Sequence, residues 1–397
     1  MSEMSYLEKL LDGVEVEWLP LGEVSALRRG RVMSKGYLTE NFGPYPVYSS
    51  QTANNGKIGS INTFDFDGEY ISWTTDGANA GTVFYRTGKF SITNVCGLIT
   101  LKSKYPLIYK FLFYWLTIEA KKHVYSGMGN PKLMSHQVEN IPVPIPCPDN
   151  PEKSLAIQSE IVRVLDKFTA LTAELTAELT AELNMRKKQY NYYRDQLLSF
   201  KEDEVEWKTL GEVAQYSKTR ISFELLDERN YVGVDNLLQN RAGKSLSNHV
   251  PTSGKLTEFI PNDILIGNIR PYLKKIWQAD CIGGTNGDVL VIRCIDSSIN
   301  TRYLYQILAD DKFFEYNMQH AKGAKMPRGS KEDIMKYPIP VPPLTWQARI
   351  VEILDKFDTL TNSITEGLPR EIELRQKQYE YYRDLLFSFP KPETVSN

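Results

Sequence analysis

Hydrogen-bonding side chains alternate with apolar ones from Asn268 to Lys275, at the end of a predicted strand. Asn268 and Arg270 are the residue types best shaped for paired hydrogen bonds to adenine and to guanine. Tyr272 and Lys274 belong to the same stretch. The chemistry predicted here is recognition of base edges, with an ordinary solvated strand end as the plainer alternative.

Two glycine-rich loops, Gly127–Lys132 and Gly323–Arg328, each end in a cation. Glycine frees the backbone, so such loops can approach a nucleic-acid groove closely. Arg28, Arg29 and Arg31 predict a flexible basic loop that holds phosphate or reaches a guanine edge, or else an exposed loop with no ligand. The candidate DNA-binding residues are Arg28, Arg29, Arg31, Lys57, Asn130, Lys132, Lys218, Arg220, Asn268, Arg270, Tyr272, Lys274, Lys325 and Arg328.

Catalytic motifs are missing from the sequence. The segment Gly243–Ser245 ends like a phosphate-binding loop, but Leu238 stands where that motif requires glycine, so a turn is expected. Asp65 and Asp67 lie in a turn-like segment, where solvated carboxylates are commoner than a catalytic pair. No Asn-Pro-Pro-Tyr or Asp-Pro-Pro-Tyr tetrapeptide marks adenine methylation, and no Gly-x-Gly-x-x-Gly follows a strand to hold a methyl donor.

Metal binding and membrane insertion are not indicated either. The four cysteines form no Cys-x-x-Cys pair, and the four histidines lack metal-ligand spacing. Glu3, Glu8 and Lys9 interrupt what would be the apolar core of a signal peptide. No apolar run approaches the ~18 residues of a membrane span. We therefore expect a cytosolic protein with reduced thiols.

Charged residues are distributed unevenly along the chain. The formal net charge is −2, yet residues 25–140 hold 13 Lys and Arg against 7 Asp and Glu, and residues 214–336 hold 17 against 14. The remaining segments are therefore strongly acidic. Two cationic blocks in an acidic frame suit two phosphate-contacting modules. An accidental bias of surface charge is the alternative, chiefly for the second block.

The chain repeats itself at an offset of 189 residues, with ten identities in fourteen over the longest match. The matching pairs are Lys187–Phe200 with Gln376–Phe389, Ile161–Phe168 with Ile350–Phe357, and Glu15–Trp18 with Glu204–Trp207. Chance does not produce such a match. The sequence is two copies of one unit, which predicts a pseudo-two-fold axis.

Two unlike blocks lie between the repeated segments. Each opens with Leu-Gly-Glu-Val, at 21–24 and 210–213, and continues in short β-branched and aromatic runs that predict strands joined by loops. A more helical stretch follows at 108–123 and at 301–320. The blocks are therefore predicted to be α+β domains.

A proline-alternating segment leads out of each block, at 141–146 and at 337–342. Proline at every second position excludes a helix or a central strand and predicts a stiff extended spacer. A long helix is predicted after each spacer, from apolar residues at three- and four-residue steps. Gly367 and Pro369 predict a break in the second helix near Leu368.

Three copies of Thr-Ala-Glu-Leu occupy residues 172–183 of the first long helix. Each copy adds about 6 Å of length and about 40° of rotation, so the run predicts a spacer adjustable by whole copies. Nineteen residues, 169–187 and 358–376, separate the same two motifs in both helices, which predicts an antiparallel pair. The expected fold is α+β, with two α+β domains joined by two long antiparallel helices.

Five segments are predicted from these boundaries. They are 1–13, an N-terminal stub packing on the C-terminal helix; 14–152, the first α+β domain; 153–200, the central helix; 201–345, the second α+β domain; and 346–397, the C-terminal helix and tail.

These features resemble the DNA-specificity subunits of type I restriction-modification enzymes, in the subclass with tandem Thr-Ala-Glu-Leu copies. The resemblance covers the whole chain. It rests on the Leu-Gly-Glu-Val opening, the proline-rich exit into Ile-Val-x-x-Leu-Asp-Lys-Phe, the Tyr-Tyr-Arg-Asp helix end and the tetrapeptide copies.

The resemblance implies two target-recognition domains, each reading one half of a bipartite sequence in double-stranded DNA. It further implies that the helices dock two modification subunits, which motor-nuclease restriction subunits join. No catalytic residue, metal or cofactor is implied in this chain, because S-adenosylmethionine, ATP and magnesium are expected on the partner subunits.

Tyrosine and arginine residues near each helix end are the candidate docking residues, since both types are enriched in protein interfaces. They are Tyr190, Tyr193, Arg194, Tyr379, Tyr382 and Arg383. Packing between the helices is the alternative for part of these rings.

Two other functions stay open at this point. One is a self-sufficient DNA-modifying enzyme, against which the missing catalytic motifs argue. The other is a coiled-coil assembly scaffold without a DNA role, against which the confinement of basic charge to the unlike blocks argues.

Overall fold

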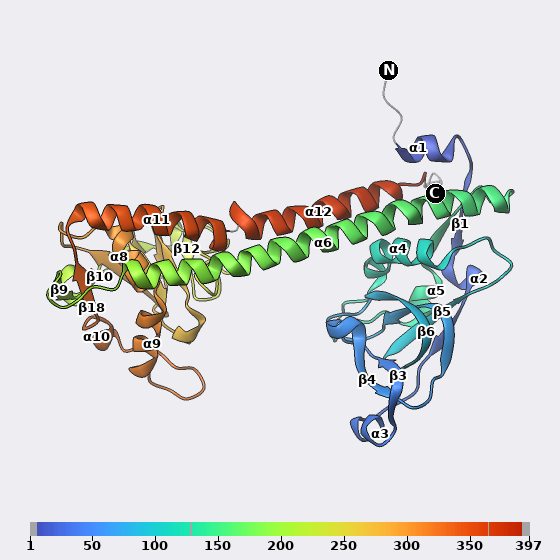
Figure 1. Cartoon of the computed structure of the whole chain (residues 1–397), viewed down its shortest axis with the longest axis horizontal. Coiled ribbons are helices and arrows are strands. Elements are labelled where there is room, and N and C mark those ends of the chain that lie inside the picture. Colours follow the sequence, from blue (N-terminus) through green and yellow to red (C-terminus); the bar gives the residue numbers. More distant parts are fainter. Residues whose placement is uncertain (1–5, 128, 364, 391–397) are drawn as a thin grey trace. The chain divides into compact units, whose positions relative to one another are not determined.

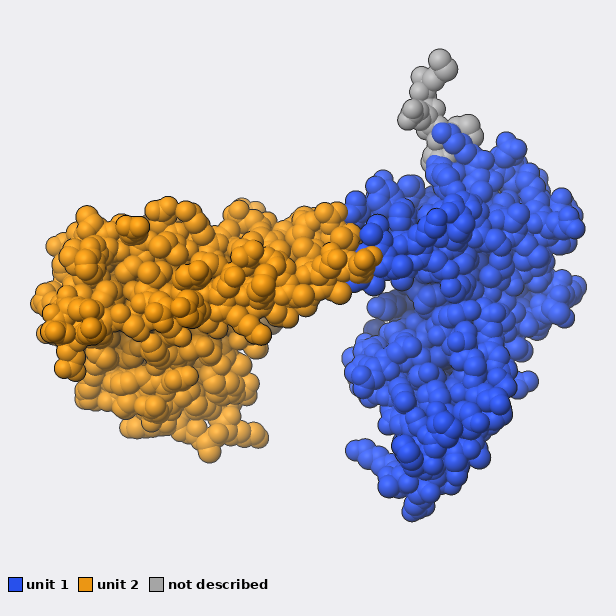
Figure 2. Space-filling model, in the orientation of Figure 1, with its two compact units in different colours: residues 1–173, 376–397 blue, residues 174–375 orange. Residues whose placement is uncertain are grey.

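The computed structural model describes residues 6–127, 129–363 and 365–390, which fall into two compact units (Figure 1, Figure 2). Unit 1 comprises residues 1–173 and 376–397, and unit 2 comprises residues 174–375. Each unit therefore contains one of the unlike blocks and a part of both long helices. No described helix has the length and apolar character that a membrane crossing requires.

A six-stranded sheet forms the centre of unit 1, in the order β2-β7-β5-β6-β3-β4. Neighbouring strands are antiparallel except β3 and β6, which run parallel. The strands are β2 Ser25–Arg29, β3 Phe42–Tyr48, β4 Lys57–Ile61, β5 Phe66–Thr74, β6 Val83–Ile92 and β7 Cys96–Leu101. The short helices are α1 Tyr6–Leu11, α2 Leu21–Val24, α3 Lys35–Glu40, η1 Ala53–Gly56, α4 Tyr109–Glu119, η2 Ala120–His123 and α5 Ser135–Glu139.

The core of unit 1 lies between this sheet and α4. Trp73 of β5 is fully buried, and a Cβ atom added to Gly97 of β7 would lie 2.1 Å from its ring, so only glycine fits there. The indole Nε1 of Trp73 donates to the Leu133 carbonyl at 3.0 Å. This bond ties the segment before α5 to the sheet.

Unit 2 repeats part of this arrangement. Its antiparallel sheet β10-β17-β14-β15 has the same sequence order as β2-β7-β5-β6, but a separate sheet, β11-β13-β16-β12, replaces the extension by β3 and β4. The strands are β10 Ala214–Tyr216, β11 Arg220–Ser222, β12 Tyr231–Val232, β13 Lys255–Phe259, β14 Ile264–Gly267, β15 Ile276–Gln278, β16 Gly283–Thr285 and β17 Val289–Cys294. The helices confined to unit 2 are α7 Leu210–Val213, η3 Phe223–Leu225, η4 Pro271–Leu273, α8 Thr301–Leu308, α9 Asp311–Gln319, α10 Lys331–Ile334 and α11 Leu344–Asn362.

The proline-alternating segments are strands rather than free spacers, which corrects the prediction. In unit 1, β8 Pro142–Pro146 pairs antiparallel with β1 Val16–Pro20, and in unit 2, β18 Pro338–Val341 pairs with β9 Glu206–Thr209. The residues between the prolines take the hydrogen-bonded positions of each ladder. The prolines occupy the other positions, where the missing N–H would point away from the partner strand.

A long helix follows each proline-alternating strand, as the sequence predicts. Helix α6 runs without interruption over Pro151–Leu197, while the second helix is divided into α11 and α12 Gly367–Leu386. The predicted break near Leu368 is confirmed, since Gly367 has φ +80°. In unit 1 the pairing is antiparallel, with the Phe168 and Tyr382 rings 5.6 Å apart and the Thr169 and Tyr379 hydroxyls 3.1 Å apart.

The described part of the N-terminal stub forms α1, which packs in the core of unit 1. Leu7 and Leu11 are buried in the same cluster as Leu386, Phe387 and Phe389 from the end of α12. The packing of the N-terminal stub on the end of the C-terminal helix, as the sequence predicts, is therefore present in unit 1.

Candidate nucleic-acid interface

The segment after β14 of unit 2 is held in an uncommon backbone conformation. Arg270 has φ +54°, in the left-handed region that disfavours side chains with a Cβ. Its backbone N–H donates to the Pro327 carbonyl at 2.7 Å, which fixes this conformation. The Arg270 side chain is exposed and makes no hydrogen bond or ion pair within the described residues. A free guanidinium is thus presented by a rigid support.

The glycine-rich loop of unit 2 is a hairpin that lies against this segment. Lys322 and Arg328 exchange backbone hydrogen bonds of 2.9 Å in both directions, and Arg328 also bridges Ile269. The hairpin therefore brings the exposed Lys325 and Arg328 to the same place as Arg270. One nitrogen of Arg328 contacts Asp288 at 3.1 Å, but its side chain remains 58% exposed.

Tyr272 projects from the one-turn helix η4 in the same segment and is 50% exposed. An exposed ring beside cations can pack on a sugar or a base, so its position suits the predicted DNA contact.

Lys274 does not join this cationic group, which corrects its assignment to DNA. Its ammonium is 2.7 Å from Asp311, the first residue of α9, and Arg241 binds the same carboxylate. Burial alone would raise the pKa of Asp311, but the hydrogen bond from Lys274 and the charge of Arg241 hold it below its ordinary value. Lys274 therefore anchors the segment.

Asn268 is structural rather than a base reader, which is a second correction. It is 7% exposed, and its backbone bonds to Asp288 and Gly329 hold the base of the hairpin. Its Oδ1 lacks a hydrogen bond among the described protein atoms.

Unit 1 contains the same hairpin with different residues. Tyr125 and Lys132 exchange backbone bonds of 2.8 and 3.0 Å, and Lys132 bridges Asp76 as Arg328 bridges Ile269. The Gly77 N–H donates to the Pro131 carbonyl at 3.0 Å, the bond that Arg270 makes to Pro327 in unit 2.

Gly77 and Arg270 thus occupy one backbone position in the two copies. Gly77 has φ +87°, and a Cβ atom there would meet nothing within 4 Å. The position is left-handed in both units, but only unit 2 places a side chain on it. The two units therefore share one backbone support, which is bare in unit 1 and carries an arginine in unit 2.

The arginine cluster of unit 1 is ordered, whereas a flexible loop was predicted. Arg28 and Arg29 belong to β2, and the Arg29 guanidinium lies 5.9 Å from the centre of the Trp73 ring. Arg29 is therefore close to the base of the hairpin, which Trp73 also binds. Arg31 is bound to Asp65 at 3.0 Å and to the Tyr37 hydroxyl at 3.1 Å, and these hydrogen bonds raise its pKa.

The other predicted contacts are spread over both units. Lys57 begins β4, Asn130 lies in the unit 1 hairpin, and Lys218 precedes β11; all three are exposed. Arg220 lies on β11 and donates to Thr257 at 3.2 Å. Sequence reasoning missed Tyr125, which is 67% exposed opposite Lys132. The correspondence between the two glycine-rich loops was the feature of the sequence that could have pointed to Tyr125.

The predicted docking residues divide into buried and exposed ones. Tyr190 and Arg194 are 3% and 2% exposed, which corrects their assignment to a docking surface. The Tyr190 hydroxyl donates to Gln306 at 3.0 Å, and burial raises its pKa. Tyr193 stacks on Phe357 with 43% exposure.

The end of α12 in unit 1 also presents partly exposed tyrosines, like the end of α6 in unit 2. Tyr382 is 39% exposed, and Tyr379 is half-buried beside Thr169. Arg383 donates weakly to Thr117 at 3.5 Å and binds Asp384. The neighbouring tyrosines, Tyr192 on α6 and Tyr381 on α12, are more exposed, at 60% and 64%.

The family model described as "Type I restriction modification DNA specificity domain" matches the chain twice, at residues 13–185 and 202–374. The chain belongs to the family of type I restriction-modification specificity subunits. This double match confirms the internal repeat and the family resemblance. A specificity subunit is the recognition component of its system, and the catalytic activities belong to other subunits.

Named specificity subunits are similar over their full length. The chain is 43% identical to the EcoR124I/EcoR124II specificity subunit of Escherichia coli, covering 100% of both proteins. It is 38% identical to the EcoprrI specificity subunit of Escherichia coli, covering 92% of this chain and 93% of that protein.

Solved structures share the fold of this specificity subunit. The S subunit from M. genitalium has a TM-score of 0.52 at 16% identity, with 98% of this chain and 100% of that chain covered. A chain from a structure concerned with assembly of the type I system has a TM-score of 0.57 at 16% identity, covering 94% and 97%.

Proposed function

We propose that each unit of this specificity subunit reads one half of a bipartite sequence in double-stranded DNA through its hairpin and the segment beneath it. The observation that carries the proposal is the position shared by Gly77 and Arg270, where the same backbone support is bare in one unit and holds an arginine in the other. Two supports of one design that present different surfaces are what two different half-sites require. Arg270 is the best placed base reader, because an exposed arginine matches guanine in the major groove.

Contacts with the phosphate backbone of DNA supply the rest of the affinity for DNA in this proposal. Exposed cations near the readers, such as Lys132, Lys325 and Arg328, suit phosphate oxygens, which position a protein without reading sequence. The excess of cations in residues 25–140 agrees with this role.

The long helices serve assembly in this proposal. The repeated, exposed tyrosine patches at Tyr192–Tyr193 and Tyr381–Tyr382 give the same surface twice, as docking of two identical modification subunits requires. Motor-nuclease restriction subunits complete the complex in the cytoplasm. S-adenosylmethionine, ATP and magnesium bind the partner subunits.

An exchange of recognition blocks tests the proposal. Replacing residues 25–140 by the corresponding block of a relative should change one half of the methylated sequence and leave the other half unchanged. Methylation mapping with the assembled complex measures both halves, and the parent complex is the control. A change in both halves would overturn independent reading by the two units.

A further inference from the structure

Helix α1 of unit 1 covers an apolar site made by the start of α6 and the end of α12. Leu7 and Leu11 are 3% and 6% exposed there. The Tyr6 hydroxyl lies 2.7 Å from Glu160 of α6 and donates to its carboxylate. A short amphipathic helix with two leucines one turn apart is thus seated on this junction.

Unit 2 repeats the junction, but no helix covers it among the residues that the structure describes. The start of α11 and the end of α6 line an open groove with a volume of about 490 Å³. Its lining residues are Gln196, Leu197, Ser199, Phe200, Glu204, Trp346, Arg349, Ile350 and Ile353. At the offset of 189, Ile157, Glu160 and Ile161 of unit 1 correspond to Trp346, Arg349 and Ile350.

Side chains that α1 buries in unit 1 have more exposed counterparts in the groove of unit 2. Ile157 of unit 1 is 4% exposed, whereas Trp346 is 55% exposed. Phe389 is 4% exposed, whereas its counterpart Phe200 is only half-buried. A tryptophan on the surface of an apolar groove is the kind of residue that protein interfaces bury.

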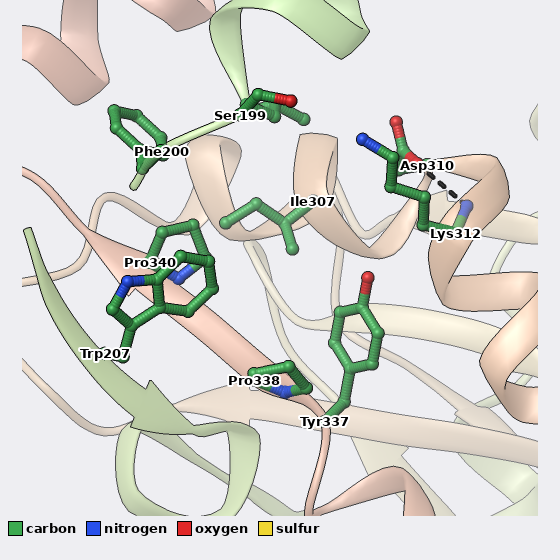
Figure 3. A pocket seen from close by; sticks show the side chains of 10 residues that line it. Ser199, Phe200, Trp207, Ile307, Asp310, Lys312, Tyr337, Pro338 and Pro340 are labelled. Carbon is green, nitrogen blue, oxygen red and sulfur yellow. Dashed lines mark hydrogen bonds between the residues drawn. The ribbon is translucent and has the colours of Figure 1, made fainter. Parts of the chain in front are cut away.

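Figure 3 shows a second cavity that Phe200 lines. Phe200 also lines the groove, so the two hollows are neighbours. The second cavity has a volume of about 320 Å³, with Trp207, Ile307 and Pro340 around it. In unit 1 the counterpart of Leu198 is Phe387, whose ring packs against Phe111 at 5.3 Å. The smaller side chain of unit 2 therefore leaves space behind Phe200.

We propose that the groove of Trp346, Arg349, Ile350, Ile353 and Phe200 binds an amphipathic helix of a partner subunit, once per chain. The helix presents two large aliphatic side chains one turn apart, as Leu7 and Leu11 do in unit 1. The inference rests on the proposed function, because the partner belongs to the same restriction-modification complex.

Charge distinguishes the partner helix from α1. Glu160 accepts the Tyr6 hydroxyl proton in unit 1, but its counterpart Arg349 is an exposed cation with no hydrogen-bonded partner among the described residues. Arg349 therefore favours an Asp or Glu where α1 has tyrosine. Because α1 fills the equivalent site in unit 1, the described residues leave this site open in unit 2 alone, so two identical subunits cannot bind it symmetrically.

Photo-crosslinking in the assembled complex tests the site. Trp346 is replaced by p-benzoylphenylalanine in the full chain, which is assembled with its modification and restriction subunits and irradiated. The linked peptide should come from a partner subunit and carry two aliphatic residues four apart and a carboxylate. The matched control replaces Tyr6, whose crosslink should fall within the chain, near Glu160.

A charge-reversal pair provides the second measurement. Arg349→Glu should weaken retention of the crosslinked partner at least tenfold, and replacing the partner's carboxylate by lysine should restore it. Lys356→Glu is the control, since Lys356 is exposed on α11 and does not line the groove. Circular dichroism verifies that the variants fold.

Three outcomes overturn the inference: no partner crosslink from position 346, a crosslink only to α1 of a second copy, or equal effects of Arg349→Glu and Lys356→Glu. If the complex assembles and methylates its sequence while position 346 stays unlinked, only this inference fails. If the complex neither assembles nor recognises DNA, the proposed function fails with it.

Discussion

Arg270 combines an unfavourable backbone conformation with an unpartnered side chain. The left-handed conformation costs a non-glycine residue about 1–2 kcal/mol, and glycine serves at the same position in unit 1. Packing does not explain the arginine, since its side chain is exposed. Binding of DNA is the physical reason that we assign to it.

Two substitutions of Arg270 separate the backbone strain at this position from the contribution of the side chain to DNA recognition. Arg270→Gly should leave the free energy of unfolding unchanged or raise it by up to about 1 kcal/mol, because relief of strain outweighs the roughly 0.5–1 kcal/mol entropic cost of glycine. Arg270→Ala should keep the strain. Both should lose about 1–3 kcal/mol of preference at one base position.

Denaturant titration measures the first effect, and binding of the assembled complex to single-base variants of its site measures the second. An equal loss of affinity on every DNA sequence would make Arg270 a phosphate contact instead of a base reader.

The Asp311 carboxylate stabilises the same segment in a pH-dependent manner. Its folded pKa is lowered, so its contribution is fully present above the unfolded value of about 3.9 and is lost as pH falls through the folded value. Asp311→Asn should destabilise the protein at neutral pH by on the order of 1 kcal/mol, a modest effect because the carboxylate is 42% exposed.

Thermal melts across pH test this effect. The difference in melting temperature between Asp311→Asn and the parent should shrink as the pH falls below about 4. A difference that stays constant with pH would show that the carboxylate's charge is not the cause.

At the scale of elements, the break between α11 and α12 depends on one glycine. A Cβ atom at Gly367 would lie 2.4 Å from the Thr359 carbonyl oxygen, in addition to the strain of φ +80°. Pro369 sits in the first turn of α12, where its missing N–H costs nothing.

Gly367→Ala should therefore lower the free energy of unfolding by about 1–2 kcal/mol or more. Pro369→Ala is the control and should change it by less than about 0.5 kcal/mol. Denaturant melts compare the two variants, and equal effects would mean that this turn does not constrain the helix break.

The sequence was sufficient for elements that follow from repetition and backbone chemistry. The repeat located the frame, the glycine and proline located the helix break, and helical spacing located α6. The proline segments were misread because sequence shows which residues lack an N–H but not which ladder positions they occupy. Pairing of β8 with β1 places every proline where no N–H is needed.

The candidate site was predictable by chain position and less so by side chain. Both hairpins were found from glycines and cations, yet Asn268 is buried and Lys274 is neutralised by Asp311. These outcomes depend on packing between segments far apart in sequence. Alternation along one strand cannot supply that information.

At the scale of the whole molecule, we propose that each unit reads its own half-site, while α6 and α12 both cross between the units. Helix α6 passes from unit 1 into unit 2 without interruption, and the Thr-Ala-Glu-Leu copies at 172–183 lie within it. A change of helix length there alters neither hairpin. We therefore predict that spacing and reading are separable properties of the chain.

Deleting residues 180–183 tests that separation. The deletion removes one copy and shortens α6 by about 6 Å, with a rotation of about 40°. One base pair spans about 3.4 Å and, at 10–10.5 per turn, about 35°, so the rotation matches one base pair and the length one to two. The unread gap between the half-sites should shrink by that amount, and both half-sites should keep their sequences.

Mapping of methylated bases by the parent and deleted complexes measures the gap directly. Replacing residues 180–183 by four alanines is the matched control, because it keeps the length of the helix and should keep the gap. An unchanged gap after deletion would make the run a filler without a role in spacing. A changed half-site sequence would show that the length of α6 also shapes the hairpins, against the independence of the two units.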